Sequence, residues 1–113
     1  MAIAKRAVRR FLLAAVVVTI VNLCGVMLAA QDTASLYKAK CSACHGADGK
    51  GDTAMGKKMG LRDLASPDVQ KMSDDELTAI IGDGKDKMPS YKKSLKPEQI
   101  KDLVGYIRSL AKK

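Results

Sequence analysis

Two cysteines and a histidine stand within five consecutive residues, Cys41-Ser-Ala-Cys44-His45. Two thiols three positions apart fall on the same side of one helical turn, so both can bond to one planar group. The adjacent histidine can then present a ring nitrogen to a metal at the centre of that group. This C-x-x-C-H pattern is typical of covalent haem attachment. The sequence therefore predicts a haem bonded to Cys41 and Cys44, with His45 as a ligand of its iron.

Other uses of this motif need groups that the sequence does not supply. A structural zinc site takes four ligands from cysteine, histidine or carboxylate, whereas His45 is the only histidine and the third cysteine, Cys24, lies in an apolar N-terminal stretch. A dithiol of the thioredoxin type sits in a βαβ context, and no segment of this sequence alternates like a strand. A plain disulfide would leave His45 without a role.

The second axial position of the iron needs a different residue type, because no second histidine exists. Methionine, lysine, water or an open position are the candidates, and the methionines after residue 30 are Met55, Met59, Met72 and Met88. Met88 precedes Pro89, which fixes the backbone and removes an amide donor, and a glycine-containing loop can wrap it over the haem. The other three are assigned to packing. We predict Met88 as the sixth ligand.

The first thirty residues have the layout of a secretory signal peptide. Four basic residues near the start precede an uncharged apolar stretch that begins at Phe11 and closes with the small pair Ala29-Ala30. We predict cleavage after Ala30, which leaves Gln31 first. Residues 11–30 are also long enough to span a bilayer as an uncleaved anchor, and that alternative stays open. Either way, residues 31–113 are expected to work outside the cytoplasm, in the periplasm or another exported location.

Residues 31–113 are predicted to form one small, mildly basic domain. The first thirty residues contribute four of the 20 basic residues and none of the 12 acidic ones, so the remainder carries a net charge of +4. That charge suits a protein that docks on acidic surfaces. No nucleic-acid partner is expected, because this part lacks Trp and Phe for base stacking. So small a domain barely builds a self-sufficient core, and a buried haem would add to it.

Helical patterns predict an all-α domain. Asp32 or Thr33 can cap a first helix, and Ser73-Asp-Asp-Glu76 forms a capping box for a later one. Residues 46–65 and 83–96 are predicted as loops, since glycines punctuate the first and the second has no apolar period. The expected helical stretches are residues 34–41, a short turn at 66–67, residues 73–82 and residues 97–110.

Residues 34–111 resemble a class I cytochrome c, most closely the small bacterial and algal cytochrome c6 or c553 type. The matching segments are Leu36-Tyr-Lys-Ala-Lys-Cys-Ser-Ala-Cys-His45, Gly46-Ala-Asp-Gly-Lys-Gly51, Gly84-Lys-Asp-Lys-Met-Pro-Ser-Tyr91 and Glu98-Gln-Ile-Lys-Asp-Leu-Val-Gly-Tyr-Ile-Arg-Ser-Leu110. The resemblance implies a small cytochrome c fold, with three to four helices wrapped around one covalently bound haem c, and ligation of its iron by His45 and Met88. It also implies that the first helix packs across the last, through Gly105 and Tyr106 opposite Tyr37.

The sequence departs from this family after the haem motif. The family often has a proline there, which helps to fix the ring of the axial histidine, whereas residues 59–64 contain none. The resemblance still implies that a backbone carbonyl of this stretch orients the His45 ring. Arg62 is a candidate partner for a haem propionate.

With both axial positions filled, the expected function is electron transfer by a monomer that is not an enzyme. Lysines in the two loops would steer redox partners with acidic docking surfaces: Lys50, Lys57, Lys58, Lys85, Lys87, Lys92 and Lys93. One alternative is a subunit that delivers electrons to a respiratory complex and is tethered to the membrane by residues 11–30. Another is a haem enzyme or gas sensor with an open sixth site, which would lack a distal histidine for acid–base catalysis.

Overall fold

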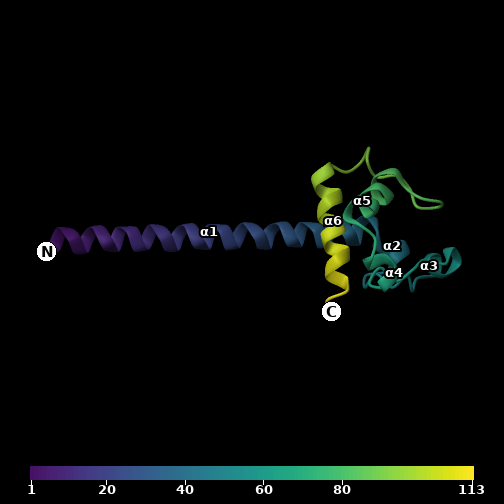
Figure 1. Cartoon of the computed structure of the whole chain (residues 1–113), viewed down its shortest axis with the longest axis horizontal. Coiled ribbons are helices and arrows are strands. Elements are labelled where there is room, and N and C mark those ends of the chain that lie inside the picture. Colours follow the sequence, from purple (N-terminus) through teal and green to yellow (C-terminus); the bar gives the residue numbers. More distant parts are fainter. The chain divides into compact units, whose positions relative to one another are not determined.

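The computed structural model describes residues 1–25 and 32–113, and the chain divides into two compact units, Met1–Asp32 and Thr33–Lys113. The first helix, α1 (Ala2–Lys40), contributes to both units (Figure 1). Asp32 and Thr33 therefore lie inside a helix, and the prediction that one of them caps it is wrong. The predicted cleavage between Ala30 and Gln31 falls outside the described residues.

The first unit consists of the N-terminal part of α1. Residues Ala2–Gly25 are apolar enough, and long enough, to cross a membrane by length and composition, a test that a signal sequence also passes. Its two polar side chains within the apolar stretch bond to the helix itself: Thr19 donates to the Ala15 carbonyl and Asn22 to the Val18 carbonyl, both at 2.8 Å. Such internal bonds lower the cost of placing these groups in an apolar medium.

The second unit combines residues 33–40 of α1 with further helices, as Figure 1 shows. These are α2 (Ser42–His45), α3 (Ala54–Met59), α4 (Pro67–Gln70), α5 (Asp74–Asp83) and α6 (Pro97–Leu110). Among the described residues there is no strand, and an isolated bridge joins Lys85 to Met88. The all-α prediction is confirmed. The capping box is also confirmed, since the Glu76 amide donates to the Ser73 hydroxyl at 3.1 Å and the Glu76 carboxylate accepts from the Ser73 amide at 2.7 Å.

Helix α3 corrects the prediction that residues 46–65 form only a loop. Its N-cap is Thr53, whose hydroxyl accepts a hydrogen bond from the Gly56 amide at 2.8 Å. It ends at Gly60, which has a left-handed backbone with φ of 64°, a conformation that glycine adopts without strain. Only six residues long, the helix is too short for an apolar period to reveal it.

The core lies where α5, α6 and the end of α1 meet. One face of α6 is buried, through Ile100, Leu103, Val104, Ile107 and Leu110. Tyr37 of α1 is 2% exposed, and its ring centroid lies 4.7 Å from that of Tyr106. The predicted packing of the first helix against the last is thus confirmed. The predicted role of Gly105 is wrong, because a Cβ at this exposed residue would meet nothing within 4 Å in the described part of the chain.

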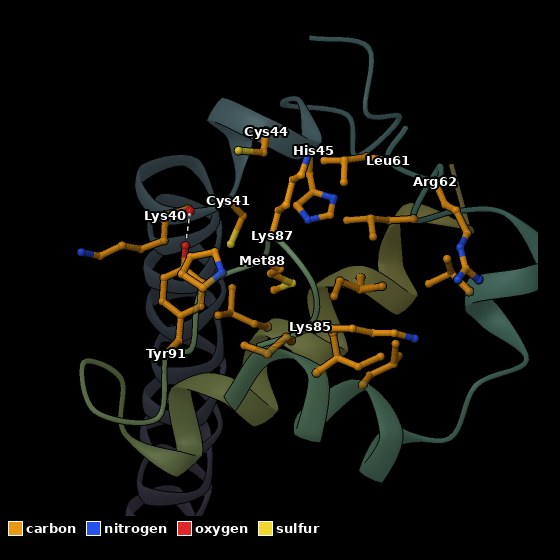
Figure 2. Close-up of a pocket in the computed structure, with 18 of the residues that line it drawn as sticks. Lys40, Cys41, Cys44, His45, Leu61, Arg62, Lys85, Lys87, Met88 and Tyr91 are labelled. Carbon is orange, nitrogen blue, oxygen red and sulfur yellow. Dashed lines mark hydrogen bonds between the residues drawn. The ribbon is translucent and has the colours of Figure 1, made fainter. Parts of the chain in front are cut away.

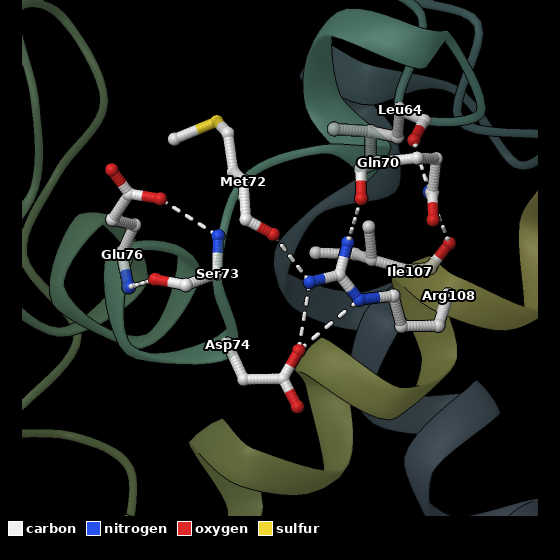
Figure 3. A network of polar contacts seen from close by, with 8 residues as sticks. All are labelled: Leu64, Gln70, Met72, Ser73, Asp74, Glu76, Ile107 and Arg108. Carbon is white, nitrogen blue, oxygen red and sulfur yellow. Dashed lines mark hydrogen bonds and ion pairs between the residues drawn. The ribbon is translucent and has the colours of Figure 1, made fainter.

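A polar network fixes the α4–α5 connection to α6 (Figure 3). The Arg108 guanidinium donates to the Gln70 carbonyl at 2.8 Å, to the Met72 carbonyl at 2.6 Å and to the Asp74 carboxylate at 2.8 Å. The Gln70 side-chain amide in turn donates to the carbonyls of Leu64 and Ile107. These bonds satisfy backbone carbonyls between two short helices, and they hold Met72 at the edge of the cavity described next.

Candidate functional site

The second unit contains a cavity of about 410 Å³ whose wall includes Cys41, Cys44, His45 and Met88. The structure thus brings together all four residues predicted to hold the haem (Figure 2). The wall is otherwise mostly apolar, with contributions from Leu61, Leu64, Val69, Leu77, Ile81, Leu103 and Ile107. Cavities lined mostly by apolar side chains favour a large apolar ligand with a few fixed polar contacts.

Backbone contacts hold the motif on α2. The Cys41 carbonyl accepts from the amide of His45 at 2.9 Å, which closes the turn that bears both thiols. Thr53 donates its hydroxyl to the Cys44 carbonyl at 2.8 Å, so the cap of α3 also anchors α2. A Cβ at Gly56 would lie 2.6 Å from that same carbonyl, so only glycine allows α3 to pack this closely.

His45 points its ring into the cavity (Figure 2). Burial lowers the pKa of this imidazole below its ordinary value and so favours the neutral ring, the form that binds a metal. Its Nδ1 is buried and has no hydrogen-bond partner among the described residues. The prediction that a carbonyl of residues 59–64 orients the ring is therefore wrong for this structure. The carbonyl of Leu61 instead faces Gly51, where a Cβ would lie 3.0 Å from it.

The Cys41 thiol does not have the character of a redox-active cysteine. Burial, reinforced by the neighbouring Cys44, raises the pKa of the Cys41 thiol to about 11. Redox-active and nucleophilic cysteines need a lowered pKa, so the environment speaks against a dithiol exchange site. Among the described residues, no group of three or more His, Cys, Asp or Glu side chains could hold a metal ion, which also speaks against zinc.

A tight turn presents Met88 to the cavity. Lys85 and Met88 exchange two backbone hydrogen bonds, of 3.2 Å and 2.9 Å, around Asp86, whose φ is 52°. The Met88 side chain points into the same cavity as the His45 ring (Figure 2). Of the other candidates, Met55 is 48% exposed and outside the wall.

The remaining two methionines also line the cavity, so their place in the wall does not by itself distinguish them from Met88. Met59 is the last residue of α3, the helix that contacts α2 and hence the histidine side of the cavity. Met72 packs against the hydrophobic core, as Met88 does, and directly precedes the capping box of α5.

Four positively charged residues contribute to the cavity wall. The wall includes Lys40, Arg62, Lys85 and Lys87, hereafter the cationic rim, with Asp86 as an acidic neighbour. Two of the lysines that we predicted to steer partners are instead paired: Lys57 with Asp52 at 2.9 Å and Lys92 with Asp83 at 2.7 Å. Lys40 was not predicted to line the cavity, because its position beside the motif does not reveal this contact.

The residues fit a haem. Two thiols on one turn, an adjacent buried imidazole and a mostly apolar wall suit a covalently attached haem.

Comparison with known proteins decides the family. Residues 28–107 match a family model described as "Cytochrome C oxidase, cbb3-type, subunit III". The chain belongs to the cytochrome c family. Members of this family bind haem covalently, so haem c is the cofactor of this cytochrome.

The relatives of this cytochrome c include two proteins named cytochrome c6. One, from Limnospira maxima, is 32% identical over 83 residues, which cover 71% of this chain and 91% of the relative. The other, from Nostoc sp., is 35% identical over 74 residues, covering 66% of this chain but only 64% of the relative. A solved structure described as "KustC0563 c-type cytochrome" is 35% identical, with a TM-score of 0.64, and the match covers 68% of this chain and 94% of that one. These findings confirm the resemblance and the all-α cytochrome c fold.

One contact in this cytochrome was not predicted. The Tyr91 hydroxyl donates to the Lys40 carbonyl at 3.0 Å, a bond drawn in Figure 2 between residues 51 apart in the chain. Burial, together with the Cys41 and Cys44 thiols, raises the pKa of this phenol, which keeps it a donor. The segment 84–91 already resembled the family, but no sequence pattern reports which distant carbonyl a tyrosine reaches.

Proposed function

We propose that this cytochrome is a single-haem electron carrier, in which Cys41 and Cys44 would bond the haem and His45 and Met88 would ligate its iron. The observation that carries the proposal is the convergence of these four side chains on one apolar cavity. When bound, the haem supplies one-electron exchange between the ferric and ferrous states of its iron.

The residues around the cavity perform the supporting roles. The neutral His45 ring is available as a ligand, because burial lowers its pKa. The Met88 thioether is a soft ligand that favours the reduced iron and raises the reduction potential. The apolar wall keeps water away. If His45 and Met88 both ligate the iron, no iron position would remain for a substrate, and we therefore propose a carrier and not an enzyme.

The ligand assignment is tested by the absorption spectrum of the oxidised protein. A methionine–iron bond gives a weak long-wavelength charge-transfer band, which we expect in the wild type and not in Met88→Ala. Met72→Ala is the matched control, because Met72 also lines the cavity but is expected to keep the band. Loss of the band in Met72→Ala and its persistence in Met88→Ala would overturn the assignment.

The partners that we propose are redox proteins with acidic docking surfaces, met outside the cytoplasm by a monomer. The cationic rim supports this, because all four of its positively charged residues belong to the cavity wall and would lie near the bound haem. Complementary charge accelerates encounter between such partners. Residues 31–113 are the proposed mature domain, with residues 1–30 as the signal peptide.

A second candidate function is a membrane-tethered subunit that delivers electrons to a respiratory complex. Two observations favour it: Ala2–Gly25 is long and apolar enough to span a membrane, and the matching family model is named for an oxidase subunit. The intact mass of the protein recovered from its host decides between the two. A mass of residues 31–113 plus one haem supports the released carrier, whereas a mass that includes residues 1–30 supports the tether.

A further inference from the structure

Tyr91 connects the segment that carries Met88 to the helix that leads into the haem motif. Its hydroxyl donates to the carbonyl of Lys40 at 3.0 Å. Lys40 is the last residue of α1 and immediately precedes Cys41. The last carbonyls of a helix have no partner within it, so the Tyr91 hydroxyl supplies a donor to a group that would otherwise need water.

The backbone of Tyr91 is fixed independently of this hydroxyl. Its amide donates to the carbonyls of Ile81 and Gly82, both at 3.1 Å, and its carbonyl accepts from the Leu95 amide at 2.8 Å. The side chain therefore extends from a rigid base at the end of α5. The hydroxyl of this side chain then connects the end of α5 to Lys40, the residue just before the turn that bears both cysteines.

Met88 belongs to residues 85–91, hereafter the Met88 segment, which the bond from Tyr91 to Lys40 connects to the end of α1. Before Met88 in the chain, Lys85 pairs with Met88 in the tight turn. After Met88, Tyr91 stands three positions further along the chain. Pro89 has no amide to donate, so the stretch between Met88 and Tyr91 has fewer backbone bonds to hold it. The Ser90 hydroxyl donates to the Gly82 carbonyl at the end of α5. The bond from Tyr91 to Lys40 is the first hydrogen bond beyond Met88 that reaches the helix leading into the haem motif.

We propose that Tyr91 is a positioning residue whose hydroxyl, bonded to the Lys40 carbonyl, holds the Met88 segment closed and so keeps external ligands off the iron. The proposal rests on the proposed ligation by Met88. Without the hydroxyl, the segment opens more often, and a small nitrogen base replaces the methionine more readily.

The test is a titration of the oxidised holoprotein with imidazole, followed by the loss of the methionine–iron band. Tyr91→Phe keeps the ring that lines the cavity and removes only the hydroxyl. One hydrogen bond to a backbone carbonyl corresponds to roughly two- to tenfold in an equilibrium constant, so we expect imidazole to bind Tyr91→Phe tighter by about that factor. Tyr106→Phe is the matched control, because Tyr106 lies on α6, outside the cavity wall, and should bind imidazole as the wild type does.

Denaturant unfolding of the same proteins separates positioning from general stability. If Tyr91→Phe lowers the free energy of unfolding but binds imidazole like the wild type, Tyr91 is only a structural residue and the proposal is overturned. If imidazole binds tighter to Tyr106→Phe by the same factor, the effect is not specific to the Met88 segment, and the proposal is again overturned. A wild type with no methionine–iron band would instead overturn the ligation by Met88, which is a separate result.

Discussion

Gly84 lies directly against the backbone of Met88. A Cβ at Gly84 would stand 2.6 Å from the Met88 carbonyl oxygen and 2.9 Å from the Ser90 amide nitrogen. Gly84 also has a φ of 80°, in the left-handed region that disfavours other residues. Because Gly84 has no side chain, the backbone of Met88 can lie directly against the end of α5.

Gly84→Ala is expected to displace Met88 from the cavity. The added methyl group meets backbone, which cannot move away as a flexible side chain would, and the left-handed conformation adds strain. We expect the methionine–iron band of the oxidised protein to weaken or vanish, with a loss of more than about 1 kcal/mol in the free energy of unfolding. Gly105→Ala is the control, because a Cβ there meets open space among the described residues; it should keep the band and gain up to about 1 kcal/mol as a helical substitution. An intact band in Gly84→Ala would contradict this prediction.

We expect the hydrogen bonds from Arg108 to backbone carbonyls to stabilise the fold more than its ion pair with Asp74 does. Its guanidinium satisfies the carbonyls of Gln70 and Met72, whereas its ion-pair partner Asp74 has a side chain that is 75% exposed. We expect Arg108→Ala to cost roughly 2–4 kcal/mol in the free energy of unfolding, and Asp74→Ala less than about 1 kcal/mol. Chemical denaturation of the two variants measures both values. Equal costs would mean that the ion pair carries the stabilisation.

The elements with strong local signals could be predicted from the sequence. The capping box Ser73–Glu76 and the apolar stripe of α6 were predicted correctly, because their signals lie within a few residues of each other. The cysteines and the histidine were brought to one cavity as expected, since the motif fixes its own geometry within one turn. Helix α3 was missed because its cap, Thr53, looks like any loop threonine until its partners are known.

The contacts that could not be predicted join residues far apart in the chain. The bond between Tyr91 and Lys40 depends on how α5 is placed relative to α1, which no local pattern encodes. The ion pairs of Lys57 and Lys92 likewise depend on loop conformation, and they remove two charges from the steering surface that charge composition had suggested. The close approach at Gly84 is another such case, since a glycine near a helix end is ordinarily read as a cap.

The cationic rim is expected to govern electron exchange with anions. The double substitution Lys85→Gln and Lys87→Gln removes two charges from the cavity wall, so the rate with ferricyanide, an anionic oxidant, should fall roughly two- to tenfold at low ionic strength. In the wild type that rate should decrease as salt is added. Lys101→Gln with Lys112→Gln, which removes the same charge from α6 and the C-terminus, should change the rate less. If both double variants slow the reaction equally, net charge and not the rim is responsible, provided that each keeps its methionine–iron band.

The capping box at the start of α5 is expected to make the stability of the folded protein depend on pH in the acidic range. The Glu76 carboxylate accepts a hydrogen bond from the Ser73 amide, which holds the pKa of Glu76 below its ordinary value of about 4.5. A carboxyl group whose pKa is lowered by folding stabilises the folded state at pH values above the unfolded pKa, and this contribution is lost as the pH falls through the folded pKa. Glu76→Gln cannot titrate, so the wild type should be more stable than the variant at pH 7, and the difference should shrink below pH 4.5 and disappear in stronger acid. Thermal unfolding of both holoproteins between pH 7 and pH 3 measures this difference in stability. Any effect of pH on haem ligation should be the same in the two proteins and so cancels in the difference. A difference that stays constant over this range would mean that the carboxylate charge plays no part in the cap.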